Sequence, residues 1–355
     1  MINKLKVGLG PRSYPILIGE MARNEILSHI DRNPCEKAVV VTDDRVGSLY
    51  GVEFLGLVRR MVGLVVVFTI PEGEKSKSFK WLESLCRAMT KSGLDRESMV
   101  IALGGGVVGD LAGLAASVYL RGVRLIQLPT TLLSMVDSSV GGKTGINIPE
   151  GKNLVGSFYQ PETVLADTSF LATLHERDWF SGLAEVIKIA LTLDTELFEY
   201  LESVHDLGPA GDLDINWIVT SACARKSEVV QLDEKEEGMR RVLNFGHTLG
   251  HGVEAAVGYG ELRHGEAILL GMKAALKLSH RMCGLPGEQR QRAVDLIERI
   301  PVPSVKIPDD LVKYIVRDKK SSGNTITSVL IKEIGEYEFV KLDDPSMLVE
   351  ALKEP

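Results

Sequence analysis

The feature that most constrains the fold is the alternation of short β-branched runs with longer helical patterns through the first half of the chain. Helical patterns cover Phe79–Lys91 and Asp110–Leu120. The intervening β-rich runs span Lys37–Thr42, Gly63–Ile70, Ser98–Leu103, Arg124–Leu128 and Thr163–Ala166. Apolar strands separated by helices are typical of a parallel sheet that is covered on both faces. The first half therefore predicts an α/β, Rossmann-like nucleotide-binding domain.

The pattern changes after about Phe170. Helical periodicity of 3.6 residues then dominates, and the only later β-rich segment, Ile326–Leu342, has the form of a hairpin around Gly335. A chain of 355 residues is also long for one hydrophobic core. We therefore expect two domains, an α/β domain over residues 1–169 and a mainly α-helical domain over residues 170–355. The helical patterns after Phe170 cover Gly182–Glu202, Trp217–Glu228, His247–Val257 and His264–His280.

A glycine motif separates a predicted strand from a predicted helix. Gly104, Gly106 and Gly109 follow the strand that ends at Leu103, and the expected helix opens at Asp110. This spacing lets backbone N–H groups approach a pyrophosphate at a helix N-terminus. The usual dinucleotide fingerprint is incomplete, because earlier strands precede the motif and no acidic residue stands near position 129. A nucleotide diphosphate site is favoured over a structural glycine turn.

Residues 128–153 form a glycine-punctuated stretch that is rich in hydrogen-bond donors. Its Gly142-Lys143-Thr144 resembles the end of a P-loop, but Asp137 stands where a P-loop requires glycine. Lys143 and Lys152 are candidate anchors for an anionic ligand, and ordinary surface charge is the alternative.

Three histidines form the strongest local signal. His247 and His251 are four residues apart and share one helical face, and His264 opens the next helical pattern. The sequence lacks the Glu beside the first histidine that a zincin would carry, which disfavours a metalloprotease. Glu185 would complete a set of two histidines and one carboxylate with open positions for water or substrate oxygens. The alternative is an interface of helices with hydrogen-bonded core histidines.

Cationic and amide side chains accompany this cluster. Lys188 lies one helical turn after Glu185, and Lys226, Arg240 and Asn244 precede His247. Ammonium and guanidinium groups bind phosphate and carboxylate through charge-assisted hydrogen bonds. This set predicts a substrate that carries both groups, although each lysine alone could lie on a solvated helix face.

Charge and cysteine usage exclude several partners. The chain carries 41 Lys and Arg against 48 Asp and Glu, a formal net charge of −7, which repels a polyphosphate backbone. It contains no run of about 18 apolar residues. We expect no nucleic-acid partner and no membrane partner. The spacing of its cysteines fits neither a disulfide framework nor a thiolate zinc site and favours the cytoplasm: Cys35, Cys86, Cys223 and Cys283.

Several long blocks together resemble the 3-dehydroquinate synthases, in the order in which that family carries them, from about Thr42 to Lys320. The blocks are GGGVVGD at 104–110, LPTTLLSMVDSSVGGKTGIN at 128–147, GKNLVGSFYQP at 151–161, GLAEVIK at 182–188 and LNFGHTLGH at 243–251. The sequence departs from the family pattern at Ala172 and at His175–Trp179.

The resemblance implies an NAD- and divalent-metal-dependent carbon–oxygen lyase of the shikimate pathway, with zinc or cobalt as the metal. Such an enzyme converts 3-deoxy-D-arabino-heptulosonate 7-phosphate, a small sugar-acid phosphate, to 3-dehydroquinate and phosphate. NAD is reduced and reoxidised within each turnover, so the sequence of steps is oxidation, phosphate elimination, reduction and aldol closure.

The resemblance also implies roles for individual residues. The metal ligands would be Glu185, His247 and His264. The catalytic and substrate-binding residues would be His251, Lys143, Lys188, Lys226, Arg240, Asn244, Lys152, Asn153, Arg121 and one of Lys319 or Lys320. The NAD-binding residues would be Asp43, Glu72, Gly73, Glu74, Lys75, Ser76, Lys77, Gly105, Gly106, Val107, Val108, Gly109, Asp110, Thr130, Thr131, Asp137, Lys143, Lys152, Phe170 and Thr173.

Arg121, in the segment YLRG, matches a residue that the family donates from the neighbouring subunit, so a homodimer is expected. Three alternatives remain open at this point. They are another sugar phosphate cyclase, a metal-dependent NAD polyol dehydrogenase, and a non-catalytic NAD-binding sensor.

Overall fold

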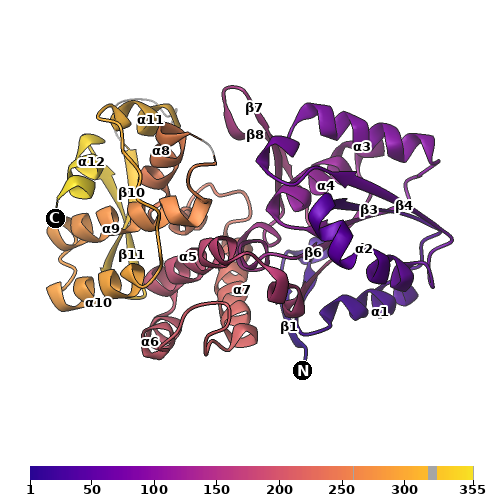
Figure 1. Cartoon of the computed structure of the whole chain (residues 1–355), viewed down its shortest axis with the longest axis horizontal. Coiled ribbons are helices and arrows are strands. Elements are labelled where there is room, and N and C mark those ends of the chain that lie inside the picture. The colour runs from indigo at the N-terminus through magenta and orange to yellow at the C-terminus, as the bar shows by residue number, and fades with distance from the viewer. Residues whose placement is uncertain (259, 319–325, 355) are drawn as a thin grey trace. The chain divides into compact units, whose positions relative to one another are not determined.

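The computed structural model describes residues 1–258, 260–318 and 326–354, and it divides the chain into two compact units. The first unit comprises 1–174 and 215–231, and the second comprises 175–214 and 232–355. The expected boundary at 169/170 lies close to the first crossing between the units, but residues 215–231 return to the first unit. In Figure 1, residues 1–174 of the first unit run from indigo to magenta, and the second unit from residue 232 onward runs from salmon through orange to yellow.

The first unit contains a seven-stranded sheet in the order β1-β2-β9-β6-β5-β3-β4. All neighbours pair in parallel except β1 and β2, which are antiparallel. The parallel strands confirm the predicted α/β class. Each of the five predicted strands begins and ends within one residue of its predicted bounds, whereas β1 and β2 were not predicted. The strands are β1 (Asn3–Val7), β2 (Tyr14–Gly19), β3 (Lys37–Asp43), β4 (Leu64–Ile70), β5 (Met99–Gly104), β6 (Arg124–Pro129) and β9 (Thr163–Asp167).

Helices cover the two faces of this sheet. α3 (Phe79–Lys91) and α4 (Gly106–Val118) pack on the face that carries Val39, Val41 and Val100. α2 (Asp44–Val58) faces the alternate residues Val40 and Thr42. Strand side chains alternate between faces, which is why consecutive residues of β3 meet different helices. The remaining helix of this region is α1 (Glu25–Arg32).

Helix α4 begins at Gly106 rather than at the predicted Asp110. The glycines therefore form the N-cap and first turn of the helix instead of a loop before it. Gly105 at the N-cap has no side chain that could accept a hydrogen bond from the first turn.

One element of the first unit, a hairpin, carries no strong sequence signal, and another, the helix predicted over Trp217–Glu228, was expected in the second domain. The hairpin of β7 (Lys143–Ile148) and β8 (Gly151–Phe158) follows a π-helical turn over Ser134–Ser138. α7 (Ile215–Leu232) joins this unit through side-chain hydrogen bonds, including Asn3 Nδ2 to Thr220 Oγ1 at 2.9 Å.

The second unit is mainly helical and ends in the predicted hairpin. One helix predicted over 182–202 is broken at Asp194, whose side chain accepts from Leu197 N and so caps a new helix. Gly335 at the turn of the hairpin has φ +90, a conformation that favours glycine. The elements are α5 (Glu176–Leu193), α6 (Thr195–Ser203), α8 (His247–Val257), α9 (His264–Met282), α10 (Gly287–Glu298), α11 (Leu311–Asp318), β10 (Ile326–Glu333), β11 (Glu336–Leu342) and α12 (Ser346–Lys353).

Within the described residues, no helix is both long and apolar enough to span a bilayer.

Close packing of α8 on α9 depends on glycine. A Cβ at position 271 would lie 1.9 Å from the carbonyl oxygen of Gly246, and a Cβ at 250 would lie 2.7 Å from Ile268 Cδ1. Neither contact is sterically possible, so any side chain there would push the helices apart.

We predict that Gly271→Ala destabilises the second unit by about 1–3 kcal/mol, because the added methyl group overpacks the helix contact. Gly56→Ala is the matched control, since nothing lies within 4 Å of its Cβ position on α2. It should stabilise the chain by about 0.5–1 kcal/mol. Urea denaturation followed by circular dichroism measures the free energy of unfolding of both variants. Equal urea midpoints for Gly271→Ala and Gly56→Ala would contradict the packing argument.

Candidate functional site

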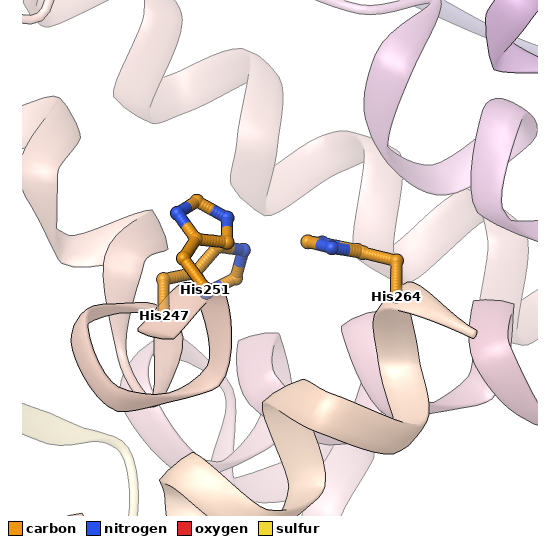
Figure 2. A group of neighbouring side chains, drawn as sticks. All are labelled: His247, His251 and His264. Atoms are coloured by element: carbon orange, nitrogen blue, oxygen red, sulfur yellow. The ribbon is translucent and has the colours of Figure 1, made fainter. Parts of the chain in front are cut away.

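Three imidazoles and one carboxylate meet inside the second unit. His247 and His251 project from α8, and His264 is the first residue of α9. One ligand atom from each histidine lies within 4.8 Å of the others. Figure 2 shows the rings directed towards one another, with His264 facing the pair on α8. Glu185 reaches the same point from the buried helix α5.

Glu185 Oε1 lies 3.5 Å from His247 Nε2 and 3.6 Å from His264 Nε2. Ligand atoms bound at about 2.1 Å to a tetrahedral ion lie about 3.4 Å apart. Oε1 is fully buried and accepts no hydrogen bond from the described residues. An unpaired acceptor at this spacing fits a divalent cation, because a buried carboxylate oxygen otherwise carries a large desolvation cost.

The charges in this cluster shift its protonation. Burial opposes ionisation of Glu185, but Lys188 and the two imidazoles hold its pKa well below the usual value. Burial, reinforced by Lys188, lowers the pKa of His247 well below its usual value. Burial also opposes protonation of His264, but Glu185 and Glu254 raise its pKa to about 9. Without a metal, a proton therefore occupies His264, and a cation would have to displace it.

Sequence reasoning missed Glu254. Its Oε2 lies 3.5 Å from His264 Nδ1, on the side of the ring away from Glu185, and the residue is buried. Its position, three residues after His251 and seven after His247, places it on the same face of α8. That helical spacing was the available signal, but carboxylates at such a spacing are common on ordinary helices.

The cationic set divides between the units. Lys188 is buried, and its ammonium donates to Glu185 Oε2. Arg240 is also buried, in the short helix η7 (Met239–Asn244), where its Nη1 donates to Glu234 O. Asn244 Nδ2 donates to Glu236 Oε1 at 2.9 Å. Lys226 differs from expectation, because α7 belongs to the first unit and Lys226 contacts Asp137 there.

The segment that departs from the family pattern connects the helix of Glu185 to the helix of His264. His175 Nδ1 accepts from Arg177 N and caps α5. Arg177 makes two 2.8 Å bonds to the carboxylate of Glu266 in the first turn of α9. Asp178 pairs with Arg263, the residue before His264, at 3.1 Å. These contacts join the helix of Glu185 to the helix of His264.

The residues expected around NAD gather at one edge of the first unit's sheet. Asp43 ends β3, residues 72–77 follow β4, Gly105 follows β5, and Thr130 follows β6. These strands are parallel neighbours, so their carboxyl ends meet at the same edge, where open α/β sheets bind ligands. Val107, Val108 and Gly109 lie in the first turns of α4, and Thr131 lies beside the motif, because a Cβ at 105 would meet its Cγ2 at 3.1 Å.

Glycine is needed at this edge for close packing. A Cβ at 104 would lie 2.6 Å from the Val108 side chain, and a Cβ at 106 would lie 3.1 Å from Ser138 Oγ. The helix N-terminus above them is uncapped by side chains. Backbone N–H groups in this arrangement fit a pyrophosphate.

Loop 72–77 is held by hydrogen bonds to neighbouring residues of the first unit. Glu72 N donates to Asp44 Oδ1 at 3.0 Å, and Ser76 Oγ donates to Pro71 O at 2.6 Å. Gly73 has φ +102, and Glu74, Lys75 and Ser76 form one 3-10 turn. Lys77 is buried, and its Nζ contacts Asp110 Oδ2 and Asn153 Oδ1, each at 2.5 Å.

Phe170 packs inside the first unit rather than lying open to a ligand. Its ring packs against the ring of Tyr50 at a tilt of 57°, with centroids 4.6 Å apart, and Tyr50 Oη is 2.6 Å from Thr173 Oγ1. Lys143 is exposed and Lys152 is half-buried, both on the β7–β8 hairpin. Lys319 and Lys320 lie outside the described residues.

Arg121 lies at the opposite edge of the sheet from these loops. It precedes β6, whereas Thr130 follows that strand, and six strand residues span about 20 Å. Leu120, Arg121 and Gly122 have φ +49, +69 and +124. Consecutive left-handed residues are strained unless glycine, and such strain is concentrated at functional segments.

Comparison with known proteins shows two family models in succession along the chain. The model described as 3-dehydroquinate synthase N-terminal matches residues 67–181, and the model described as 3-dehydroquinate synthase C-terminal matches residues 182–321. A 3-dehydroquinate synthase from Acinetobacter baylyi is 42% identical over 357 residues, which cover 99% of this chain and 98% of that protein.

Solved structures of related cyclases share the fold. A 2-deoxy-scyllo-inosose synthase complexed with carbaglucose-6-phosphate, NAD⁺ and Co²⁺ is 25% identical, with a TM-score of 0.91 and 99% of both chains covered. A 2-epi-5-epi-valiolone synthase from Streptomyces hygroscopicus, with NAD⁺ and Zn²⁺ bound, is 30% identical, with a TM-score of 0.84 and coverage of 96% and 95%. Since the family models match most of the chain and the Acinetobacter relative matches nearly all of it, the chain belongs to the 3-dehydroquinate synthase family.

Proposed function

We propose that this protein is an NAD- and metal-dependent 3-dehydroquinate synthase, which converts 3-deoxy-D-arabino-heptulosonate 7-phosphate to 3-dehydroquinate and phosphate. Family membership supports the reaction. The observation that carries the proposal is the buried, unpaired Glu185 Oε1, which lies 3.5 and 3.6 Å from two imidazole nitrogens. Such a site suits a cation that binds substrate oxygens in its open positions.

Glu185, His247 and His264 would hold the divalent ion, and the uncapped turn at Gly105–Asp110 would hold the NAD pyrophosphate. When bound, the metal would acidify a coordinated alcohol and NAD⁺ would accept the hydride from its carbon. The Zn²⁺, Co²⁺ and NAD⁺ bound by the two cyclases of similar fold support both assignments.

The protein's own side chains then position the substrate and manage protons. The ammonium of Lys188 keeps Glu185 ionised, so the carboxylate is ready as a ligand. Phe245 O, 3.1 Å from His247 Nδ1, orients that ring so that Nε2 faces Glu185. His251 has a ring nitrogen within 4.8 Å of both other histidines and would exchange a proton with substrate.

Cationic and amide donors of the chain would bind the anionic groups of the substrate. Phosphate and carboxylate are recognised by charge-assisted hydrogen bonds from ammonium and guanidinium groups. We assign this binding to Lys143, Lys152, Asn153, Lys188, Lys226, Arg240, Asn244 and one of Lys319 or Lys320.

We propose a cytoplasmic homodimer in which Arg121 serves the partner's site. Arg121 is about 20 Å along the strand direction from its own unit's cofactor loops. Val118, Leu120 and Phe158 are exposed near it, at 50%, 40% and 42% of their surfaces. An apolar patch around a strained loop that presents a guanidinium is typical of an interface. The cysteines are free, as a reducing compartment would keep them.

The first experiment separates a cyclase from the alternatives. With substrate and catalytic amounts of NAD, the purified protein should release one phosphate per substrate without net NADH. A polyol dehydrogenase would accumulate NADH, another cyclase would require a different sugar phosphate, and a sensor would release nothing. Any of these three results would refute the proposed reaction.

The second prediction concerns the metal. His247→Ala should lose stoichiometric metal and activity while remaining folded, because an open three-ligand site binds an ion poorly with two ligands. His251→Ala should keep its metal and turn over slowly. His280→Ala is the matched control, since this histidine hydrogen-bonds Leu285 O at 2.7 Å and lies about 24 Å along α9 from His264, so the variant should keep both. Elemental analysis measures metal content, and equal metal loss at His247 and His251 would require the ligand assignment to be revised.

The third prediction concerns Arg121. Arg121→Ala should weaken substrate binding by about 1.5–3 kcal/mol, the usual contribution of a charge-assisted hydrogen bond. Mixing this variant with His247→Ala in equal amounts should restore about one quarter of wild-type activity. Half of the dimers are then mixed, and one of the two sites in each mixed dimer is intact. Native mass spectrometry verifies subunit exchange. Mixed dimers without recovered activity would contradict a site shared between subunits.

A further inference from the structure

We propose that Asn147 is a positioning residue that joins the NAD-binding loop to the substrate-binding hairpin, and this inference rests on the proposed function. Its backbone N–H donates to Lys77 O at 2.9 Å, and its Nδ2 donates to Glu74 Oε1 at 2.7 Å. Its Oδ1 accepts from Asn153 N at 2.9 Å. One residue thus hydrogen-bonds two residues assigned to NAD, through the Glu74 side chain and the Lys77 carbonyl, and the backbone amide of one assigned to substrate.

The hairpin itself does not require all of these bonds. The bond between Asn147 Oδ1 and Asn153 N closes the turn of β7 and β8. The bond to Glu74 leaves the hairpin and reaches a loop 73 residues earlier in the chain. The turn of the hairpin can therefore form without the bond from Asn147 Nδ2 to Glu74 Oε1.

The third residue of the link, Asn153, has a left-handed backbone. Its φ is +55, a conformation that asparagine adopts more readily than other residues with a side chain. Asn147 Oδ1 accepts from its backbone amide, and Lys77 Nζ contacts its side chain at 2.5 Å. The left-handed turn is therefore held from two sides by residues of the same link.

The buried ion pair of Lys77 extends the link to helix α4. Lys77 Nζ contacts Asp110 Oδ2 at 2.5 Å, and its backbone carbonyl accepts from Asn147 N. Asp110 lies in the second turn of the helix whose N-terminus is assigned to the pyrophosphate. Displacement of the hairpin would therefore move the residues around NAD, and the converse also holds.

Two variants at this position separate its contacts. Asn147→Ala removes both side-chain bonds. Asn147→Asp keeps the acceptor for Asn153 N but places a carboxylate against Glu74. Asn3→Ala is the matched control, because this half-buried asparagine of the first unit also donates one bond across segments, to Thr220 Oγ1.

Hydrogen–deuterium exchange and calorimetry with NAD⁺ provide the readouts. In Asn147→Ala, exchange should accelerate in residues 72–77 and 151–154 together, and the Kd for NAD⁺ should rise about tenfold, as for other supporting contacts of ligand-binding groups. In Asn147→Asp, amide exchange should accelerate in residues 72–77, while the backbone amide of Asn153 should stay protected from exchange. Asn3→Ala should match the wild type in both measurements.

Faster exchange in the hairpin alone, with an unchanged Kd for NAD⁺, would overturn the link. Should Asn147→Ala not fold, the isosteric Asn147→Asp carries the test, and an unaltered 72–77 loop in that variant would equally overturn it. If the wild type bound no NAD⁺ but Asn147→Ala still accelerated exchange in residues 72–77 and 151–154 together, the link would be supported and the proposed function refuted.

Discussion

The second unit depends on keeping one ionised carboxylate out of water. Glu185 lies on α5, where every residue from Trp179 to Thr192 is buried. Isolated burial of this charge would cost several kcal/mol, and Lys188 and two imidazoles offset that cost. The arrangement requires α9 to pack closely on α5, which Gly265 permits against Ser181, and α8 to pack closely on α9, which Gly246 and Gly271 permit. The same helix contacts therefore both pack the second unit and place the groups of its candidate site.

The candidate site of the first unit differs in kind, because it is formed mainly by backbone N–H groups. Four neighbouring parallel strands end at one edge, and the uncapped N-terminus of α4 lies there. Helix N-termini attract anions through free N–H groups and the helix dipole. The hairpin of β7 and β8 adds side chains to this edge, and Asn147 links them to the loop after β4.

Prediction from sequence succeeded where the signal was local and periodic. The strand from Lys37 was found from its continuous β-branched run, and the helix from Phe79 was found from its period of 3.6 residues. It was less accurate where a side chain intervened, as at Asp194, which caps α6 and divides one predicted helix in two. It also assigned Lys226 to the helical half, although α7 returns to the first unit and places that lysine beside Asp137.

The α/β class, the glycine turn and the spacing of His247 and His251 could all be predicted from the chain, because each of these depends on residues close together in it. The folded structure was needed to show which distant groups meet: the Glu254 carboxylate beside His264, the Arg177 guanidinium on Glu266, and the Asn147 amide between Glu74 and Asn153. These contacts join segments that are 6 to 89 residues apart. Helical and strand periodicity shows which way a side chain faces but carries no information on what it faces, since that depends on how separate elements pack.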